Sequence, residues 1–151
     1  MIKYVNGDIL YTKMPVIAHG VSTDDDFKVG LGLTLRQAYP EMYKEFRQHL
    51  KSSRPRAGEY WMWRNPAKSL LQLFIRDEGS KAKQSHVNRA LHELQRHHKE
   101  LGIQGLALTR LGAGLGKLGW DEAKPAIEDQ LAALPFPVVV YENYAPGKKA
   151  E

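Results

Sequence analysis

Short runs of apolar and aromatic residues alternate along the chain with segments in which apolar residues recur every three or four positions. The short runs are bounded mostly by Gly, Pro and Asn and predict strands over residues 1–5, 15–20, 58–64, 69–75, 105–109 and 137–141. The helical spacing predicts helices over residues 33–50, 85–101 and 121–134. Taken in chain order, these elements predict a layered α/β domain built on a mixed sheet.

Glycine-rich segments follow two of the predicted strands and lead into helices. Residues 111–116 read LGAGLG and precede a helix for which Asp121 is the expected N-cap, and residues 28–32 read KVGLG. Glycine lets the backbone approach a ligand closely, and a helix N-terminus favours a phosphate group. Such junctions meet at the carboxyl ends of the strands of an α/β sheet. The two segments therefore predict a diphosphate site, with tight turns that bind nothing as the alternative.

Acidic residues stand near the ends of the first two strands. The carboxylate of Asp8 could accept a hydrogen bond from an exocyclic amine such as that of adenine. Its alternative role is to cap a short helical turn over residues 9–12. Residues 24–26 are three consecutive aspartates, which would repel a phosphate. They could bind ribose hydroxyls or a metal, but a solvated loop is the interpretation that we favour.

Composition narrows the class of protein. The 151 residues and the hydrophobic content of 42% suit one globular domain with a sizeable core. No apolar run is long enough to span a bilayer and no secretory signal pattern opens the chain, so we expect no membrane association. The absence of cysteine excludes disulfides, thiol catalysis and Cys-based zinc sites, and fits a cytoplasmic protein, which we expect to be a monomer. The formal net charge of +5 favours acidic partners such as nucleotides, or else serves only solubility.

Histidine spacing argues against a metal site. The helix predicted over residues 85–101 carries His86, His92, His97 and His98. Two ligands on one helical face must lie three or four residues apart, and no two of these histidines do. We therefore expect no metal ion.

A nucleic-acid surface is a further possibility. Arg54, Arg56 and Lys68 lie near Trp61 and Trp63 in the sequence, and exposed tryptophans can stack on bases. Core packing is the role that we expect for the tryptophans. Binding to nucleic acid would weaken steeply with salt.

Three separated motifs resemble those of the macrodomain family. They are GD at residues 7–8, the glycine segment at residues 28–32 and GAGLGKLGW at residues 112–120. Within that family, AHGVS at residues 18–22 and LGAGLGKLGW look most like the terminal ADP-ribose protein glycohydrolases and the DNA ADP-ribosyl glycohydrolase antitoxins. The resemblance implies a three-layer α/β/α fold with a central mixed sheet of about six strands. The domain would cover residues 1–144, followed by a polar tail at residues 145–151.

The resemblance also implies that the chain binds ADP-ribose, free or attached to a protein or nucleic acid, without a cofactor. Asp8 would bind the adenine amine, assisted by the backbone N–H of Ile9. Tyr141 and Asn143 would flank the base, with a core position at the sheet edge as the alternative for Tyr141. The positions around the distal ribose and the diphosphate would be His19, Ser22, Lys28, Val29, Gly30, Leu31, Gly32, Gly112, Ala113, Gly114, Leu115 and Gly116.

Three departures from the group's motifs bear on catalysis. The family asparagine near the distal ribose is not evident, and His19 and Ser22 occupy that segment. Catalytic members carry a lysine just after the strand that we place at residues 69–75, where Asp77 stands here. The protein-directed enzymes have an aspartate after the glycine loop, where Gly116 stands here, as in the DNA-directed group. We predict Asp77, Lys81 and Lys83 as the catalytic residues, with residues 24–26 as further substitutes. A lysine could attack C1″ or position the leaving group, and an aspartate could act as a base.

Two functions follow from these features. The first is a hydrolase that removes ADP-ribose from an acidic side chain, a nucleobase or a 1″-phosphate. The second is a reader that binds ADP-ribose without turning it over. The missing lysine favours the reader, whereas the resemblance to a hydrolase group favours the enzyme, which is the function that we expect.

Overall fold

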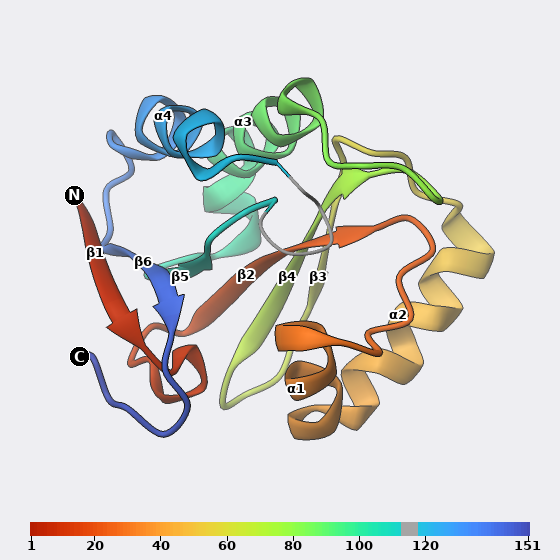
Figure 1. Cartoon of the computed structure of the whole chain (residues 1–151), viewed down its shortest axis with the longest axis horizontal. Helices are drawn as coiled ribbons and strands as arrows, with labels where there is room; N and C mark the ends of the chain where they lie inside the picture. The colour runs from red at the N-terminus through yellow and green to blue at the C-terminus, as the bar shows by residue number, and fades with distance from the viewer. Residues whose placement is uncertain (113–117) are drawn as a thin grey trace.

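Three layers make up the molecule, with a six-stranded sheet in the middle (Figure 1). The structure is a computed structural model, and it describes residues 1–112 and 118–151. The strands are β1 (Ile2–Gly7), β2 (Val16–Ser22), β3 (Tyr60–Trp63), β4 (Ser69–Arg76), β5 (Leu106–Thr109) and β6 (Val138–Tyr144). The helices are α1 (Gly30–Ala38), α2 (Pro40–Ser53), α3 (Gln84–Leu101) and α4 (Trp120–Leu131), with a short 3-10 helix η1 (Ile9–Tyr11). The expected three-layer fold and mixed sheet are confirmed.

The order of the strands brings five strand ends to one edge of the sheet. Along the sheet the order is β1-β6-β5-β2-β4-β3, and β3 alone pairs antiparallel with its neighbour, β4. β3 and β4 form an antiparallel hairpin. Every other neighbouring pair is parallel, so β1, β2, β4, β5 and β6 all run the same way. The loops that follow these strands therefore meet at one edge.

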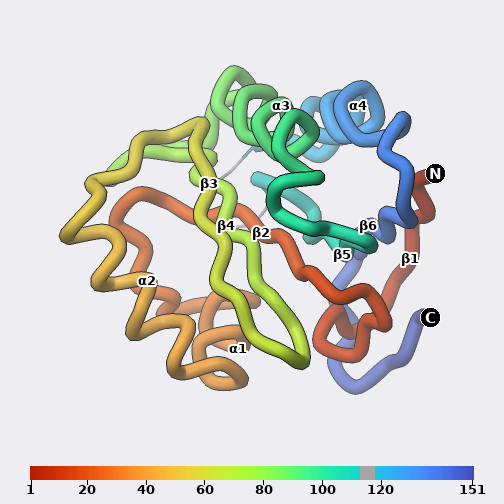
Figure 2. Tube along the Cα trace, turned by 180° about the vertical axis from the view of Figure 1, so that it is seen from behind, coloured from red at the N-terminus to blue at the C-terminus, as the bar shows by residue number. Residues whose placement is uncertain are grey.

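Each face of the sheet buries its own apolar cluster because side chains alternate along a strand. On β4, Leu71 and Leu73 pack with α3 and α4, whereas Leu70 and Phe74 pack with α1 and α2. Figure 2, from behind, shows α3 and α4 above the sheet and α1 and α2 below it. The cluster below the sheet extends to Phe27 in the loop after β2. It therefore supports the loops at the strand ends.

The prediction of one continuous helix over residues 33–50 is wrong. α1 already begins at Gly30 and ends at Ala38, and α2 begins at Pro40. Tyr39 between them has φ −132° and ψ 68°, outside the helical region. The ring of a proline disfavours the α conformation at the preceding residue, and Pro40 imposes this on Tyr39.

The start residues predicted for the two later helices are also wrong. Lys83 is the N-cap residue of α3 and Gly119 that of α4, and neither makes a side-chain capping hydrogen bond. Asp121 lies instead in the first turn of α4, where its charge still favours the positive end of the helix. Gly102 ends α3 with φ 70°, as its position in the sequence predicts. Within the described residues, no helix has both the length and the apolar character to cross a membrane.

The segment after β6 folds back over the first loop of the chain. Ala145 N donates to Gly7 O at 2.9 Å, and Asp8 N donates to Lys148 O at 2.7 Å. A β-carbon at Gly7 would lie 2.8 Å from Cβ of Ala150, closer than real β-carbons approach. The residues expected to form a polar tail therefore pack against the end of β1.

Candidate functional site

A cavity of about 610 Å³ opens at the edge of the sheet where the parallel strands end. Its walls come from η1, β2 and the loop after it, the start of α1, the end of β4, the segment after β5, and β6. The predicted site residues on these walls are Ile9, His19, Val29, Gly30, Leu31, Gly32, Gly112, Tyr141 and Asn143. The structure thus brings together around one space residues that lie far apart in the sequence.

Other predicted site residues do not border this cavity. Among the described residues these are Asp8, Ser22, Lys28, Asp77, Lys81 and Lys83. The side chain of Lys28 is 72% exposed, and its Nζ lies 3.8 Å from Asp26 Oδ2. Asp77 Oδ1 accepts a hydrogen bond from Ala57 N at 3.4 Å, and Lys81 and Lys83 are exposed. The predicted positions Ala113, Gly114, Leu115 and Gly116 lie outside the described residues.

Asp8 has both carboxylate oxygens engaged by backbone N–H groups. Oδ1 accepts from Leu10 N at 3.0 Å, which is the N-cap of η1, and Oδ2 accepts from Gly147 N at 2.8 Å. The capping alternative is therefore confirmed. Each carboxylate oxygen has a second lone pair, so the binding of an adenine amine stays a prediction.

The amino end of α1 is a cradle suited to an anion. The first backbone hydrogen bond that closes the helix runs from Leu33 N to Val29 O at 3.2 Å, so the N–H groups of Gly30, Leu31 and Gly32 precede it. Gly30 has φ 59°, a conformation that favours glycine, and a β-carbon there would meet nothing within 4 Å. All three residues line the cavity. Helix N-termini of this kind bind phosphate through free N–H groups and the helix dipole.

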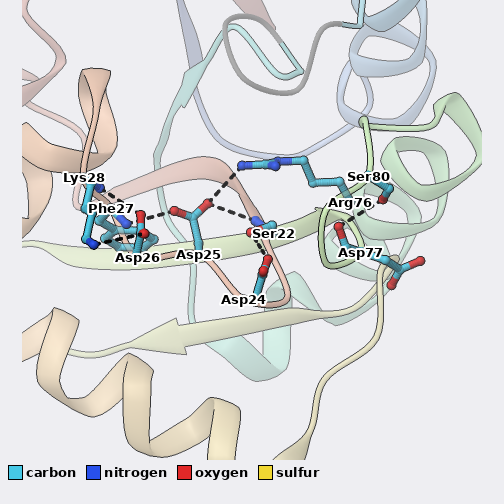
Figure 3. A network of polar contacts seen from close by, with 9 residues as sticks. All are labelled: Ser22, Asp24, Asp25, Asp26, Phe27, Lys28, Arg76, Asp77 and Ser80. Carbon is cyan, nitrogen blue, oxygen red and sulfur yellow. Dashed lines mark hydrogen bonds and ion pairs between the residues drawn. The ribbon is translucent and has the colours of Figure 1, made fainter.

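The acidic loop after β2 is more ordered than the sequence predicts (Figure 3). Asp25 Oδ2 accepts from Ser22 N and Oδ1 accepts from Phe27 N, both at 3.0 Å. Asp24 and Asp26 are exposed, but the side chain of Asp25 is only 15% exposed and lines the cavity. The interpretation as a solvated loop is therefore wrong for Asp25. The loop also carries a positive φ of 51° at Phe27.

Arg76, the last residue of β4, supplies a cation at the cavity that the sequence analysis missed. Its Nη2 lies 3.6 Å from Asp25 Oδ2, and its carbonyl oxygen accepts from Thr23 N at 3.1 Å. These contacts tie the loop after β2 to the end of β4 (Figure 3). Arg110, after β5, is a second arginine on the cavity wall. The available signal was position alone, since Arg76 directly precedes the place where we looked for a lysine.

His19, on the cavity wall, forms a buried pair with Gln72. The two residues are register partners on β2 and β4, and His19 Nε2 lies 2.8 Å from Gln72 Oε1. Burial lowers the pKa of His19 below its usual 6.5, although the hydrogen bond to Gln72 and the charge of Asp25 act in the opposite direction. The neutral imidazole therefore dominates at neutral pH.

This pKa shift predicts that His19 makes the fold acid-sensitive. Because the folded chain has the lower pKa, the unfolded chain binds the proton first as the pH falls below 6.5. The contribution of neutral His19 to the stability of the fold is complete above pH 6.5. It is lost as the pH falls from 6.5 to the lower pKa of the folded chain. The melting temperature should fall more between about pH 7.5 and about pH 5.5 in the wild type than in His19→Gln, which does not titrate. Equal falls in the two proteins would contradict the assignment.

Tyr141 lies in the core and also borders the cavity, so it combines the two positions that the sequence analysis considered for it. It is 4% exposed and belongs to the core below the sheet, yet it also borders the cavity. Its hydroxyl donates to the Glu151 carboxylate, and burial raises its pKa. Asn143 is exposed, and its Nδ2 donates to Asn6 Oδ1 at 2.9 Å. Both side chains are placed at the end of β6 that the resemblance assigns to the base.

The nucleic-acid surface is smaller than the sequence suggests. Lys68 Nζ donates to Thr12 O and Met14 O, both at 2.6 Å, and burial lowers its pKa. The rings of Trp61 and His49 stack with their centroids 5.1 Å apart. Trp61 and Trp63 both pack against the core below the sheet. Both tryptophans are half-buried against this core, so the core role expected for them holds in part. In the described part of the chain, no group of three His, Cys, Asp or Glu side chains is placed to hold a metal ion.

Comparison with known proteins finds relatives but no matching family model. The chain is 26% identical over 148 residues to the DNA ADP-ribosyl glycohydrolase of Thermus aquaticus. The matched region covers 94% of this chain and 41% of that protein. It is 23% identical over 142 residues to human ADP-ribose glycohydrolase OARD1, covering 93% of this chain and 90% of that protein. The chain thus spans about two fifths of the length of the bacterial relative and most of the human one.

Solved structures show the same similarity in three dimensions. The macrodomain of Thermus aquaticus DarG matches with a TM-score of 0.86 at 26% identity, covering 94% of this chain and 98% of that chain. Thermosipho africanus DarTG in complex with ADP-ribose matches with a TM-score of 0.88 at 22% identity, covering 98% of this chain and 42% of that chain. The expected resemblance to this group is confirmed.

Proposed function

Since the chain has the fold of a macrodomain, we propose that its cavity binds ADP-ribose and that it hydrolyses ADP-ribose from a modified protein or nucleic acid. The observation that carries the proposal is the convergence on one cavity of the amino end of α1, the end of β6 and the buried His19. A volume of about 610 Å³ suits a nucleotide-sized ligand, since small-molecule sites span about 300–1,000 Å³.

The ligand would extend across the strand ends. The diphosphate would lie at the amino end of α1, where the backbone N–H groups of residues 30–32 and the helix dipole favour its charge. The resemblance implies that residues 112–116 would cradle it from the other side, and residues 113–116 of this segment lie outside the described residues. Adenine would lie beside Tyr141 and Asn143, with Asp8 and Ile9 at its edge. The distal ribose would lie near His19, with Ser22 at the end of β2 and Lys28 in the loop that follows.

Hydrolysis at C1″ of the distal ribose is the reaction that we propose. The relatives are named as glycohydrolases, which favours the enzyme over the reader. Asp77 holds the group's lysine position, and Lys81 and Lys83 follow on the same exposed segment, where they could position the leaving group. We further propose that the chain is cytoplasmic and acts as a monomer, and sedimentation at 17.1 kDa would support the monomer.

The test is calorimetry with ADP-ribose, followed by release assays on an ADP-ribosylated oligonucleotide and an ADP-ribosylated acidic peptide. We expect micromolar binding, weaker binding of ADP, and release of free ADP-ribose from at least one substrate. Binding without release would support the reader, and no binding would remove both functions. Asp77→Ala, Lys81→Ala and Lys83→Ala test the catalytic prediction. At least one should lower release by about 100-fold while ADP-ribose still binds.

A further inference from the structure

Gln72 fixes which nitrogen of His19 carries the proton. Gln72 Nε2 lies 3.2 Å from Trp61 O and 3.1 Å from Leu70 O. Backbone carbonyls only accept hydrogen bonds, so the group that faces them is the NH₂ of the amide. The carbonyl Oε1 of Gln72 is then the atom 2.8 Å from His19 Nε2, and it can only accept. His19 is therefore the Nε2–H tautomer, and its Nδ1 holds a free lone pair.

His19 itself lies in the cavity wall in a protected position. His19 is 4% exposed and Gln72 is fully buried, yet His19 forms part of the cavity wall. The ring of Phe27 meets the imidazole edge-on with centroids 5.6 Å apart, so a second neighbour restricts its rotation. The described residues provide no hydrogen-bond partner for Nδ1 among the side-chain contacts of the site. A basic nitrogen held in one orientation at a ligand-sized cavity has the properties of a general base.

We propose that His19 Nδ1 is the general base of the hydrolysis and that Gln72 is its positioning residue, an inference that rests on the proposed function. Nδ1 takes a proton from a water molecule while the oxygen of that water bonds to C1″ of the distal ribose. The bond between C1″ and the leaving atom breaks, and its electron pair departs with the modified group. The imidazolium then gives its proton to solvent, which restores the neutral ring.

The charges around the cavity fit this cycle. In the described residues the charged groups on its walls are Asp25, Arg76, Arg110 and Glu142. Burial keeps His19 neutral before reaction, and the nearby carboxylate of Asp25 stabilises the imidazolium that forms. Arg76 pairs with Asp25 and so offsets part of this effect. Direct attack by water needs no lysine nucleophile, which accounts for a hydrolase with Asp77 at the lysine position.

Two variants of the full chain separate the roles of base and positioning residue. His19→Gln retains an amide N–H for Gln72 but removes the base, so kcat should fall by about 100- to 10,000-fold while ADP-ribose affinity changes less than about threefold. The wild type should lose activity as the pH falls through the lowered pKa of His19, which lies below 6.5, and the residual activity of His19→Gln should not. Gln72→Met keeps the base but removes the acceptor that selects the Nε2–H tautomer. Its loss of kcat should therefore be smaller than that of His19→Gln.

A spectroscopic readout tests the tautomer independently of activity. ¹⁵N spectra of the wild-type imidazole should show a protonated Nε2 and an unprotonated Nδ1, and Gln72→Met should show a mixture of tautomers. A wild-type Nδ1–H tautomer, or wild-type kcat and pH dependence in His19→Gln, overturns the proposal. A wild type that binds ADP-ribose and releases none refutes the hydrolase function itself. The two failures are distinct, because the second appears before any variant is made.

Discussion

Glutamate in place of Gly32 is expected to weaken ADP-ribose binding by about 100-fold or more, which is about 2.8 kcal/mol of binding free energy. Gly32 is the third residue of α1 and lies on the cavity wall. A carboxylate there would compete with the diphosphate for the free N–H groups of the first turn and would repel its charge. Calorimetric titration of the wild type and the variant measures the effect directly.

The fold should survive this change. Gly32 has no positive φ, and a β-carbon there would meet Phe27 Cα at 3.5 Å and Cβ at 3.7 Å, which are ordinary contacts. A glutamate in the first turn also favours the positive end of a helix by about 0.3–1 kcal/mol. The melting temperature should therefore stay equal or rise, so lost binding cannot be attributed to unfolding.

Gly32→Gln and Gly32→Ala are the matched controls for charge and size. Gln has the size of Glu without its charge, so the Glu–Gln difference isolates electrostatic repulsion and should shrink as salt rises. Gly32→Ala should bind within about threefold of the wild type, since a methyl group fits the contacts at this position. An affinity of Gly32→Glu close to that of the wild type would place the diphosphate elsewhere.

The sheet and its layers could be predicted because the apolar pattern reports burial directly. The break at Tyr39 could not be predicted from that pattern, because apolar residues at helical spacing continue across it, from Tyr39 through Met42 to Phe46. The local rule for residues that precede proline decided the outcome. Pattern and local stereochemistry disagreed here, and stereochemistry prevailed because the clash with the proline ring is short-ranged and unavoidable.

The site was predictable where backbone conformation defines it and not where side-chain pairing does. Glycine at residues 30 and 32 pointed to the amino end of α1, which does line the cavity. Asp25 could not be distinguished from Asp24 and Asp26, because only the folded loop shows which carboxylate accepts from the N–H groups of Ser22 and Phe27. Gln72 did leave a signal, since one amide in the apolar run LLQLF must find a buried partner. That partner, His19, lies 53 residues away and becomes visible only when β2 pairs with β4.

Phe46→Ala is expected to lower the free energy of unfolding by about 3–5 kcal/mol. Phe46 on α2 is fully buried, and its ring centroid lies 4.9 Å from that of Phe27 and 6.0 Å from those of Trp61 and Phe74. Truncation removes buried apolar surface, leaves a cavity and breaks aromatic contacts. Domains of this size have a total stability of about 5–15 kcal/mol, so urea unfolding at equilibrium resolves the change easily.

Phe46→Leu and the site itself provide the controls for this prediction. Leucine fills most of the space, so its cost should be well below that of alanine, about 1–2 kcal/mol. Phe27 also touches the His19 ring, so the loosened cluster should weaken ADP-ribose binding in Phe46→Ala even where the protein is still folded. A cost below about 1.5 kcal/mol for Phe46→Ala would mean that α2 packs loosely on the sheet. In that case this cluster would not support the loop after β2 or His19. The β2–β4 pairing alone would then have to hold them in place.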